Sequence, residues 1–278
     1  MLDALRCLHG ELSAQRSAAL ATIVRQHGSA PRGMGAWLVA NTRGLVAGSV
    51  GGGLPEARTL AACAALCVRV GSSAPALARL LRMPLDATTD LACGGDVLLL
   101  LEAFAPHAET LALLELMLAH DGEGALLVRA LPPQAAEATP HHWGCRTADG
   151  AWRGAPLPFP GVPSLPEALE RASNLPAGGA AATVTLAGVE CFVAHLAAPE
   201  RLFLIGGGHV ALATARLADC TGFAVHVMDN RPEFASNLRF PQAQVRLTPG
   251  YADIFASLAV NARDYIVIHA CPAKVQKK

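Results

Sequence analysis

The chain has 278 residues, of which 52% are hydrophobic and only 16% are charged. This composition supports a large apolar core and excludes an intrinsically disordered chain. Lys+Arg and Asp+Glu both number 22, so no excess of charge points to nucleic acid or an anionic membrane as a partner. The apolar stretches are too short to span a bilayer, no signal peptide is evident, and the eight scattered cysteines form no Cys-x-x-Cys pair. We therefore expect a protein of the reducing cytoplasm.

The first part of the chain mixes helical and strand periodicities. Leucines at three- and four-residue steps predict an amphipathic helix over 2–16. We then expect strands over 19–25, 36–41, 45–50, 78–83, 95–104 and 124–131, with helices over 55–69 and 108–120. The tight turn at 42–44 predicts a hairpin.

The middle of the chain, residues 132–182, is rich in Pro, Gly and Ala. We interpret it as a variable insertion that contains a hairpin around Trp143 and Trp152. Residues 183–196 have the pattern of two short strands. These segments complete a first, mixed α/β domain over 1–198.

A second domain is expected over 199–278. Strands over 201–205, 223–230, 243–248 and 264–270 alternate with a helix within 206–222 and another near 250–260. This alternation predicts a Rossmann-like parallel sheet. A full dinucleotide fold has about six strands, so the domain is interpreted as truncated after its fourth strand. We expect the edge of that strand to be covered by a partner subunit or by the chain's own tail.

A dinucleotide-binding pattern lies where the first strand of this domain passes into its first helix. Gly206 makes the tight turn, Gly208 lets a pyrophosphate approach the backbone, and Ala211 is small enough for close packing of the helix on the strand. The helix N-terminus would then face the phosphates. The pattern predicts the fold, while nucleotide binding stays one of two alternatives.

Three further residues near this pattern are candidates for contacts with a bound nucleotide. Asp229, 23 residues after Gly206, ends the second strand and is placed to accept from ribose hydroxyls. Arg231 would instead favour an additional phosphate. His209 is placed either to contact a phosphate or to cap the helix.

Three glycine-containing segments of the first domain form a second candidate site. They are "GSAPR" (28–32), "GSVGGGLPE" (48–56) and "CGG" (93–95). Glycine-rich turns leave N–H groups that converge on an anion, and an arginine grips phosphate with two parallel hydrogen bonds. The segments therefore predict a pocket for a phosphorylated ligand, with three ordinary turns as the alternative.

The cysteines raise separate questions. Cys93 is either a thiol that contacts a soft metal or accepts sulfur, or a small residue packed before a strand. Cys63 and Cys67 share a helix face, and we interpret them as core residues rather than metal ligands.

Four stretches together carry a resemblance to a known family. They are "TIVRQHGSAPRGMGAWLV", "AGSVGGGLPEAR", "ACGGDVLLLLE" and the segment from "FVAHL" to "RPEFA". The chain resembles the xanthine dehydrogenase accessory protein family (XdhC/CoxI). This resemblance implies a maturation factor, rather than an enzyme with a turnover of its own, that binds the molybdenum cofactor, holds it during sulfuration and delivers it to a molybdenum hydroxylase apo-enzyme. It also implies a cysteine desulfurase as sulfur donor, and we expect a homodimer.

The resemblance carries over to particular positions. The matching residues of the first domain are Ser29, Pro31, Arg32, Gly48, Ser49, Gly51, Gly52, Gly53, Glu56, Cys93, Gly94 and Gly95. By the resemblance, the glycine triplet would hold the pterin phosphate or the edge of the pterin ring. Many relatives have a cysteine where this chain has Leu54, so a thiol role falls to Cys93 or is absent here. Glu56 has a simpler reading as a favourable charge on the first helical turn.

Two other classes of protein stay open. An NAD(P)-dependent oxidoreductase would use Gly206, Gly208 and Asp229, but needs a nicotinamide half and an acid–base pair that the sequence does not show clearly. A nucleotide-sensing scaffold would bind a nucleotide without turnover.

Overall fold

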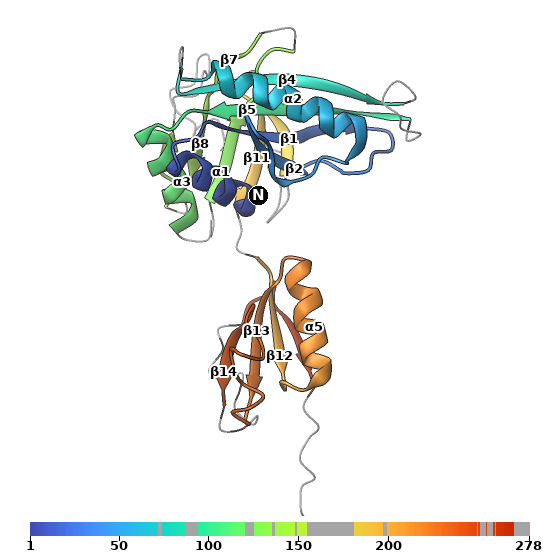
Figure 1. Cartoon of the computed structure of the whole chain (residues 1–278). Helices are drawn as coiled ribbons and strands as arrows, with labels where there is room; N and C mark the ends of the chain where they lie inside the picture. The colour runs from blue at the N-terminus through green and yellow to red at the C-terminus, as the bar shows by residue number, and fades with distance from the viewer. Residues whose placement is uncertain are drawn as a thin grey trace, which may run out of the picture. The chain divides into compact units, whose positions relative to one another are not determined.

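A computed structural model describes residues 1–71, 74–86, 94–119, 125–134, 137–147, 149–154, 181–196, 199–248, 250, 254, 258 and 260–269. The chain divides into two compact units, Met1–Ala198 and Pro199–Lys278 (Figure 1). Each unit has its own hydrophobic core.

A six-stranded sheet organises the first unit, with the order β3-β2-β1-β5-β4-β7. Its strands are β1 (Ala18–His27), β2 (Trp37–Asn41), β3 (Gly44–Gly48), β4 (Ala76–Leu85), β5 (Gly95–Phe104) and β7 (Thr139–Pro140). All neighbours are antiparallel, and β2 and β3 form the expected hairpin.

The two faces of this sheet are covered by different elements (Figure 1). Helix α2 (Gly53–Arg69) packs on one face, where Ala19, Ala21 and Ile23 of β1 are buried. Helix α1 (Leu2–Ser13) packs on the other face against Ala18 and Leu20. Successive side chains of β1 point to opposite faces of the sheet, and both faces of this strand are buried.

A second, five-stranded sheet completes the first unit, with the order β10-β11-β6-β8-β9. Its strands are β6 (Ala125–Ala130), β8 (Trp143–Arg146), β9 (Trp152–Gly154), β10 (Ala181–Leu186) and β11 (Val189–Leu196), and α3 (Ala108–Ala119) packs with α1. Strands β7, β8 and β9 lie in the segment interpreted as a variable insertion, yet they extend both sheets. The hairpin around Trp143 and Trp152 is confirmed.

Helix α1 is shorter than the leucine periodicity predicted. It ends at Ser13, and Gln15 has a φ of 58°. Backbone hydrogen bonds from Gln15 N to the Leu12 carbonyl and from Arg16 N to the Glu11 carbonyl, each 3.0 Å, close the end of the helix. The Arg16 guanidinium also donates two hydrogen bonds of 2.8 Å to the Glu11 carboxylate.

The second unit is a parallel sheet with the order β14-β13-β12-β15. Its elements are β12 (Arg201–Ile205), α5 (His209–Cys220), β13 (Ala224–Asp229), β14 (Gln244–Leu247) and β15 (Tyr265–Ile268). In chain order these strands are arranged 3-2-1-4, as in a Rossmann half-domain, so the predicted α/β fold class is confirmed. Most of the helix expected near 250–260 lies outside the described residues.

Strand β15 forms one edge of this sheet. Tyr265 and Ile268 are 50% and 63% exposed. The expectation that a partner subunit or the chain's own tail covers this edge stays a prediction.

Candidate functional site

The three glycine-containing segments of the first unit meet at one end of the six-stranded sheet. Strands β1 and β5 pair up to His27 and Asp96, and Ser29 then forms a bridge with Gly94. A Cβ on Gly95 would lie 2.3 Å from the carbonyl oxygen of Ser29 and 2.4 Å from that of His27. Only glycine allows this approach of the first and third segments.

The middle segment adjoins the first one. A Cβ on Gly51 would lie 3.3 Å from Cβ of Pro31, and the φ of Gly51 is 130°. Residues 28–32, 48–56 and 94–95 therefore form one group, called here the glycine cluster. Cys93 lies outside the described residues, so its two readings stay open.

The Glu56 carboxylate occupies the nest of amides in this cluster. Its Oε2 accepts hydrogen bonds from Ser49 Oγ at 2.6 Å, Val50 N at 3.0 Å and Gly52 N at 3.2 Å. Gly51 N donates to Ser49 Oγ at 3.1 Å. Glu56 thus returns to the start of α2 as the acidic partner in a capping box does.

The lowered pKa of Glu56 agrees with this placement of its carboxylate. Burial alone would raise the pKa of Glu56, but the hydrogen bonds from Ser49, Val50 and Gly52 outweigh it and lower the pKa. The expectation that the amides of Val50, Gly51 and Gly52 are free for a ligand is therefore wrong. Val50 N and Gly52 N donate to the Glu56 carboxylate, and Gly51 N donates to the Ser49 hydroxyl.

Other groups of the glycine cluster remain open to a ligand. Among the described residues, no atom lies within 4 Å of a Cβ built on Gly52 or on Gly94, so both backbones face open space there. The Arg32 side chain is exposed and makes no hydrogen bond or ion pair with any described residue. A flat ligand can approach the glycine backbone here, and the guanidinium is available for a phosphate.

The turn of the second unit has the geometry expected of a Rossmann fingerprint. Gly206 has a φ of 104°, and its N–H donates to the Met228 carbonyl at 2.7 Å. Ala211 lies in the first turn of α5 and is completely buried in the core of the second unit. His209, the first residue of α5, is exposed and provides no side-chain cap, because the N-cap is Gly208.

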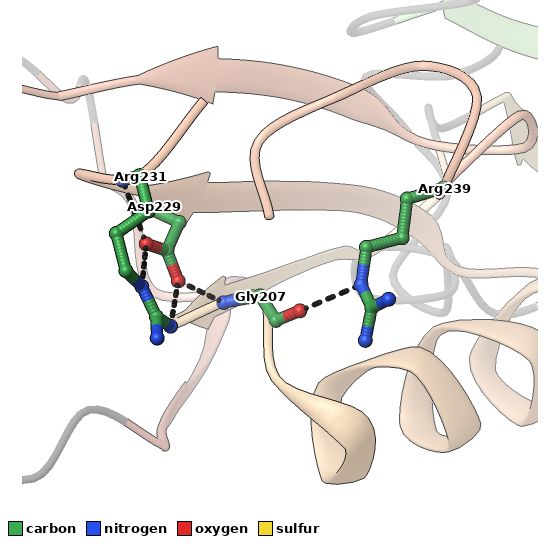
Figure 2. A network of polar contacts seen from close by, with 4 residues as sticks. All are labelled: Gly207, Asp229, Arg231 and Arg239. Carbon is green, nitrogen blue, oxygen red and sulfur yellow. Dashed lines mark hydrogen bonds and ion pairs between the residues drawn. The ribbon is translucent and has the colours of Figure 1, made fainter. Parts of the chain in front are cut away.

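Asp229 is the centre of a polar network beside this turn (Figure 2). It accepts hydrogen bonds from Gly207 N at 2.7 Å and from the backbone N and side chain of Arg231 at 2.9 Å. Burial would raise the pKa of Asp229, but Arg231 and the amides outweigh it and hold the pKa at about 2. The carboxylate is completely buried, so the expected bonds to ribose hydroxyls do not fit this arrangement.

The first unit contains a buried ionic network that the sequence did not predict. Arg129 Nη1 donates to Glu102 Oε2 at 2.6 Å and to Thr22 Oγ1 at 3.0 Å, and Nε2 of His141 lies 2.7 Å from Glu102 Oε1. The network links β1 and β5 of the first sheet to β6 of the second. The available signal was an acid and an arginine within apolar strand runs, "LLLLEAF" and "LLVRA".

A cavity of about 840 Å³ lies at the other end of the six-stranded sheet, beside α3. Its lining includes Ala76, Leu113, Trp143 and Arg153, and it shares no residue with the glycine cluster. Ala76 and Leu85 are at opposite ends of β4, and Leu85 pairs with Gly95. The cavity is therefore separate from the candidate site.

The described residues also bear on a metal site and on membrane insertion. Within the described ranges, no group of three or more His, Cys, Asp or Glu side chains is placed to hold a metal ion. Burial raises the pKa of both Cys63 and Cys67 to about 12, which agrees with core residues. In the same part of the chain, no helix is long and apolar enough to cross a membrane.

The fold and the two glycine turns define a two-unit α/β protein with a Rossmann-like second unit. A model of the XdhC and CoxI family matches residues 11–79, and a model of the XdhC Rossmann domain matches residues 202–274. The chain belongs to the XdhC and CoxI family.

One solved structure extends this likeness over most of the chain. It is a crystal structure at 2.80 Å resolution of a Bacillus halodurans protein described as a xanthine dehydrogenase. The two chains share 17% sequence identity with a TM-score of 0.71, over 95% of this chain and 74% of the other. At this identity the likeness shows the fold alone. A comparison with curated proteins gave no match.

Proposed function

We propose that this chain is an accessory protein in the maturation of a xanthine dehydrogenase-type molybdenum hydroxylase, and that it holds the molybdenum cofactor at the glycine cluster. The observation that carries the proposal is the convergence of the three family motifs beside an open glycine backbone and an arginine without a partner in the described residues. Membership of the XdhC and CoxI family supports the accessory role. We expect the apo-enzyme and a cysteine desulfurase as partners, a homodimer, and a cytoplasmic location.

The residues present fit a pterin that carries a phosphate. Gly52 and Gly94 leave room for a flat ring edge against their backbones. Arg32 supplies a fork of donors for the phosphate. The cofactor, when bound, would supply the molybdenum centre that receives sulfur.

Glu56 has a supporting role in this proposal. Its carboxylate fixes the loop 49–52 before any ligand binds, so the open face of Gly52 is preorganised. The same negative charge disfavours a phosphate inside the nest. We therefore assign the phosphate to Arg32 and the ring edge to the glycine backbone.

Co-purification tests the proposal. The protein is isolated from cells that make the cofactor, and the bound small molecule is identified by mass spectrometry. We expect molybdopterin with the wild-type protein and a large loss with Gly52→Ala. Gly188→Ala is the matched control, because Gly188 also has a positive φ and open space around its Cβ position but lies in the β10–β11 turn. Equal retention by both variants would refute the proposed site.

A further inference from the structure

The carboxylate of Asp229 has no acceptor capacity left for a ligand. A carboxylate offers about four lone-pair sites. Oδ1 accepts from the backbone N and Nε of Arg231, and Oδ2 accepts from Gly207 N and Nη2 of Arg231. In NAD-binding Rossmann domains the acid at this position holds the ribose diol. In this chain the carboxylate oxygens of Asp229 already accept hydrogen bonds from Arg231, so they are not available to a ribose diol.

Arg231 stands between Asp229 and solvent. Its side chain is 50% exposed, whereas that of Asp229 is not exposed at all. The Arg231 guanidinium makes a cation–π contact with Phe234, with 3.8 Å between Cζ and the ring centroid. Figure 2 shows the guanidinium beside the Asp229 carboxylate. An arginine at the ribose position is the feature that accommodates a 2′-phosphate.

A second arginine approaches the turn from its other side. In Figure 2, Arg231 and Arg239 flank Gly207, and Nε of Arg239 donates to the Gly207 carbonyl at 3.0 Å. No acid among the described residues pairs with Arg239, and its buried Nη2 has no hydrogen-bond partner there. Two guanidiniums therefore lie beside the turn, one on each side of Gly207. Guanidinium groups favour a phosphorylated ligand.

We infer that the second unit binds a nucleotide whose ribose carries a phosphomonoester, as in an NADP-type dinucleotide, and that it discriminates against the free ribose diol. Arg231 is the specificity-determining residue. The amide end of α5, which begins at His209, would face the diphosphate. This inference does not rest on the function proposed for the glycine cluster.

The test compares ligand pairs on the full chain by calorimetry. We expect NADP⁺ to bind at least about tenfold tighter than NAD⁺, and 2′,5′-ADP to bind tighter than 5′-AMP by a similar factor, since a charge-assisted hydrogen bond is lost in each case. Inorganic phosphate alone should compete weakly. Equal or tighter binding of NAD⁺, or no binding of either dinucleotide, would overturn the inference.

Substitution of Arg231 gives the sharper result. Arg231→Ala frees acceptor sites on both oxygens of Asp229, so we expect the preference to reverse in favour of NAD⁺. The ratio of the two dissociation constants reports this reversal even if part of the variant is unfolded. Arg231→Lys, which keeps the charge but loses the fork, should give an intermediate ratio. Arg263→Ala is the control, because Arg263 precedes β15 at the opposite ends of the strands. An unchanged ratio in Arg231→Ala would contradict the assignment.

Discussion

The Arg129 guanidinium donates a hydrogen bond of 2.6 Å to the Glu102 carboxylate, and both side chains are almost completely buried. Burial would raise the pKa of Glu102, but the charge of Arg129 and the hydrogen bond from His141 outweigh it and lower the pKa. Each charge is tolerated only because the other is present. The pair therefore ties the two sheets of the first unit together.

Removal of one partner should be strongly destabilising. We expect Glu102→Gln or Arg129→Met to lower the free energy of unfolding by about 3–5 kcal/mol, since each leaves an uncompensated buried group. The double variant Glu102→Met with Arg129→Met should recover much of this loss. Urea denaturation measures all three, and a single variant that costs less than about 1 kcal/mol would contradict the account.

Two adjacent glycines should respond differently to a methyl group. In Gly95→Ala the new Cβ meets the carbonyl oxygens of Ser29 and His27, so we expect a loss of about 3 kcal/mol or more, together with displacement of the 28–32 loop. The new methyl group of Gly94→Ala meets no atom of the described residues, and the substitution costs about 1–2 kcal/mol through its positive φ of 70°. Thermal unfolding of both variants checks the difference. Equal losses would argue against the close contact of the first and third segments.

Glu56 should stabilise the start of α2 in a pH-dependent manner. We expect Glu56→Gln to lower stability at neutral pH by about 1–2 kcal/mol, as for loss of a cap. The folded pKa is lowered, so the contribution is present above the unfolded value of 4.5 and disappears as the pH falls through the folded pKa. Denaturation at pH 7 and pH 4 measures the change. Glu109→Gln, an exposed acid in the first turn of α3, is the control and should have a smaller effect.

Asp229 should titrate well below an ordinary aspartate. In a carbon-detected NMR titration we expect a midpoint at a pH of about 2 in the wild-type protein. Its stabilising contribution is complete above the unfolded value of 3.8 and is lost as the pH falls through about 2. In Arg231→Ala the midpoint should rise, because the largest favourable interaction is gone. A midpoint near 3.8 in the wild-type protein would mean that Arg231 does not hold the carboxylate.

Much of the fold could be predicted from local patterns. The turn at 42–44 between two short apolar segments indicated the β2–β3 hairpin, and the strand–turn–helix around Gly206 indicated the Rossmann-like unit. These features depend on residues close together in the chain. The grouping of the three glycine segments was also expected, because glycine-rich turns can converge on an anion and the family resemblance includes all three motifs.

The charged contacts could not be predicted in the same way. Arg129 is 27 residues from Glu102 and 107 residues from Thr22, so nothing local indicates that they meet. The pairing of Asp229 with Arg231 is local, but it depends on a side-chain conformation supported by Phe234. The return of Glu56 to Ser49 likewise depends on the path of residues 49–52, which glycine leaves open.

The most direct test of cofactor binding at the glycine cluster is titration of the purified protein with isolated molybdopterin. Arg32→Ala is compared with Arg43→Ala, an exposed arginine in the β2–β3 turn. We predict that Arg32→Ala raises the dissociation constant about tenfold or more, as expected for loss of a charge-assisted hydrogen bond, and that Arg43→Ala leaves it unchanged. The same dissociation constant in the wild-type protein and in both variants would contradict the account.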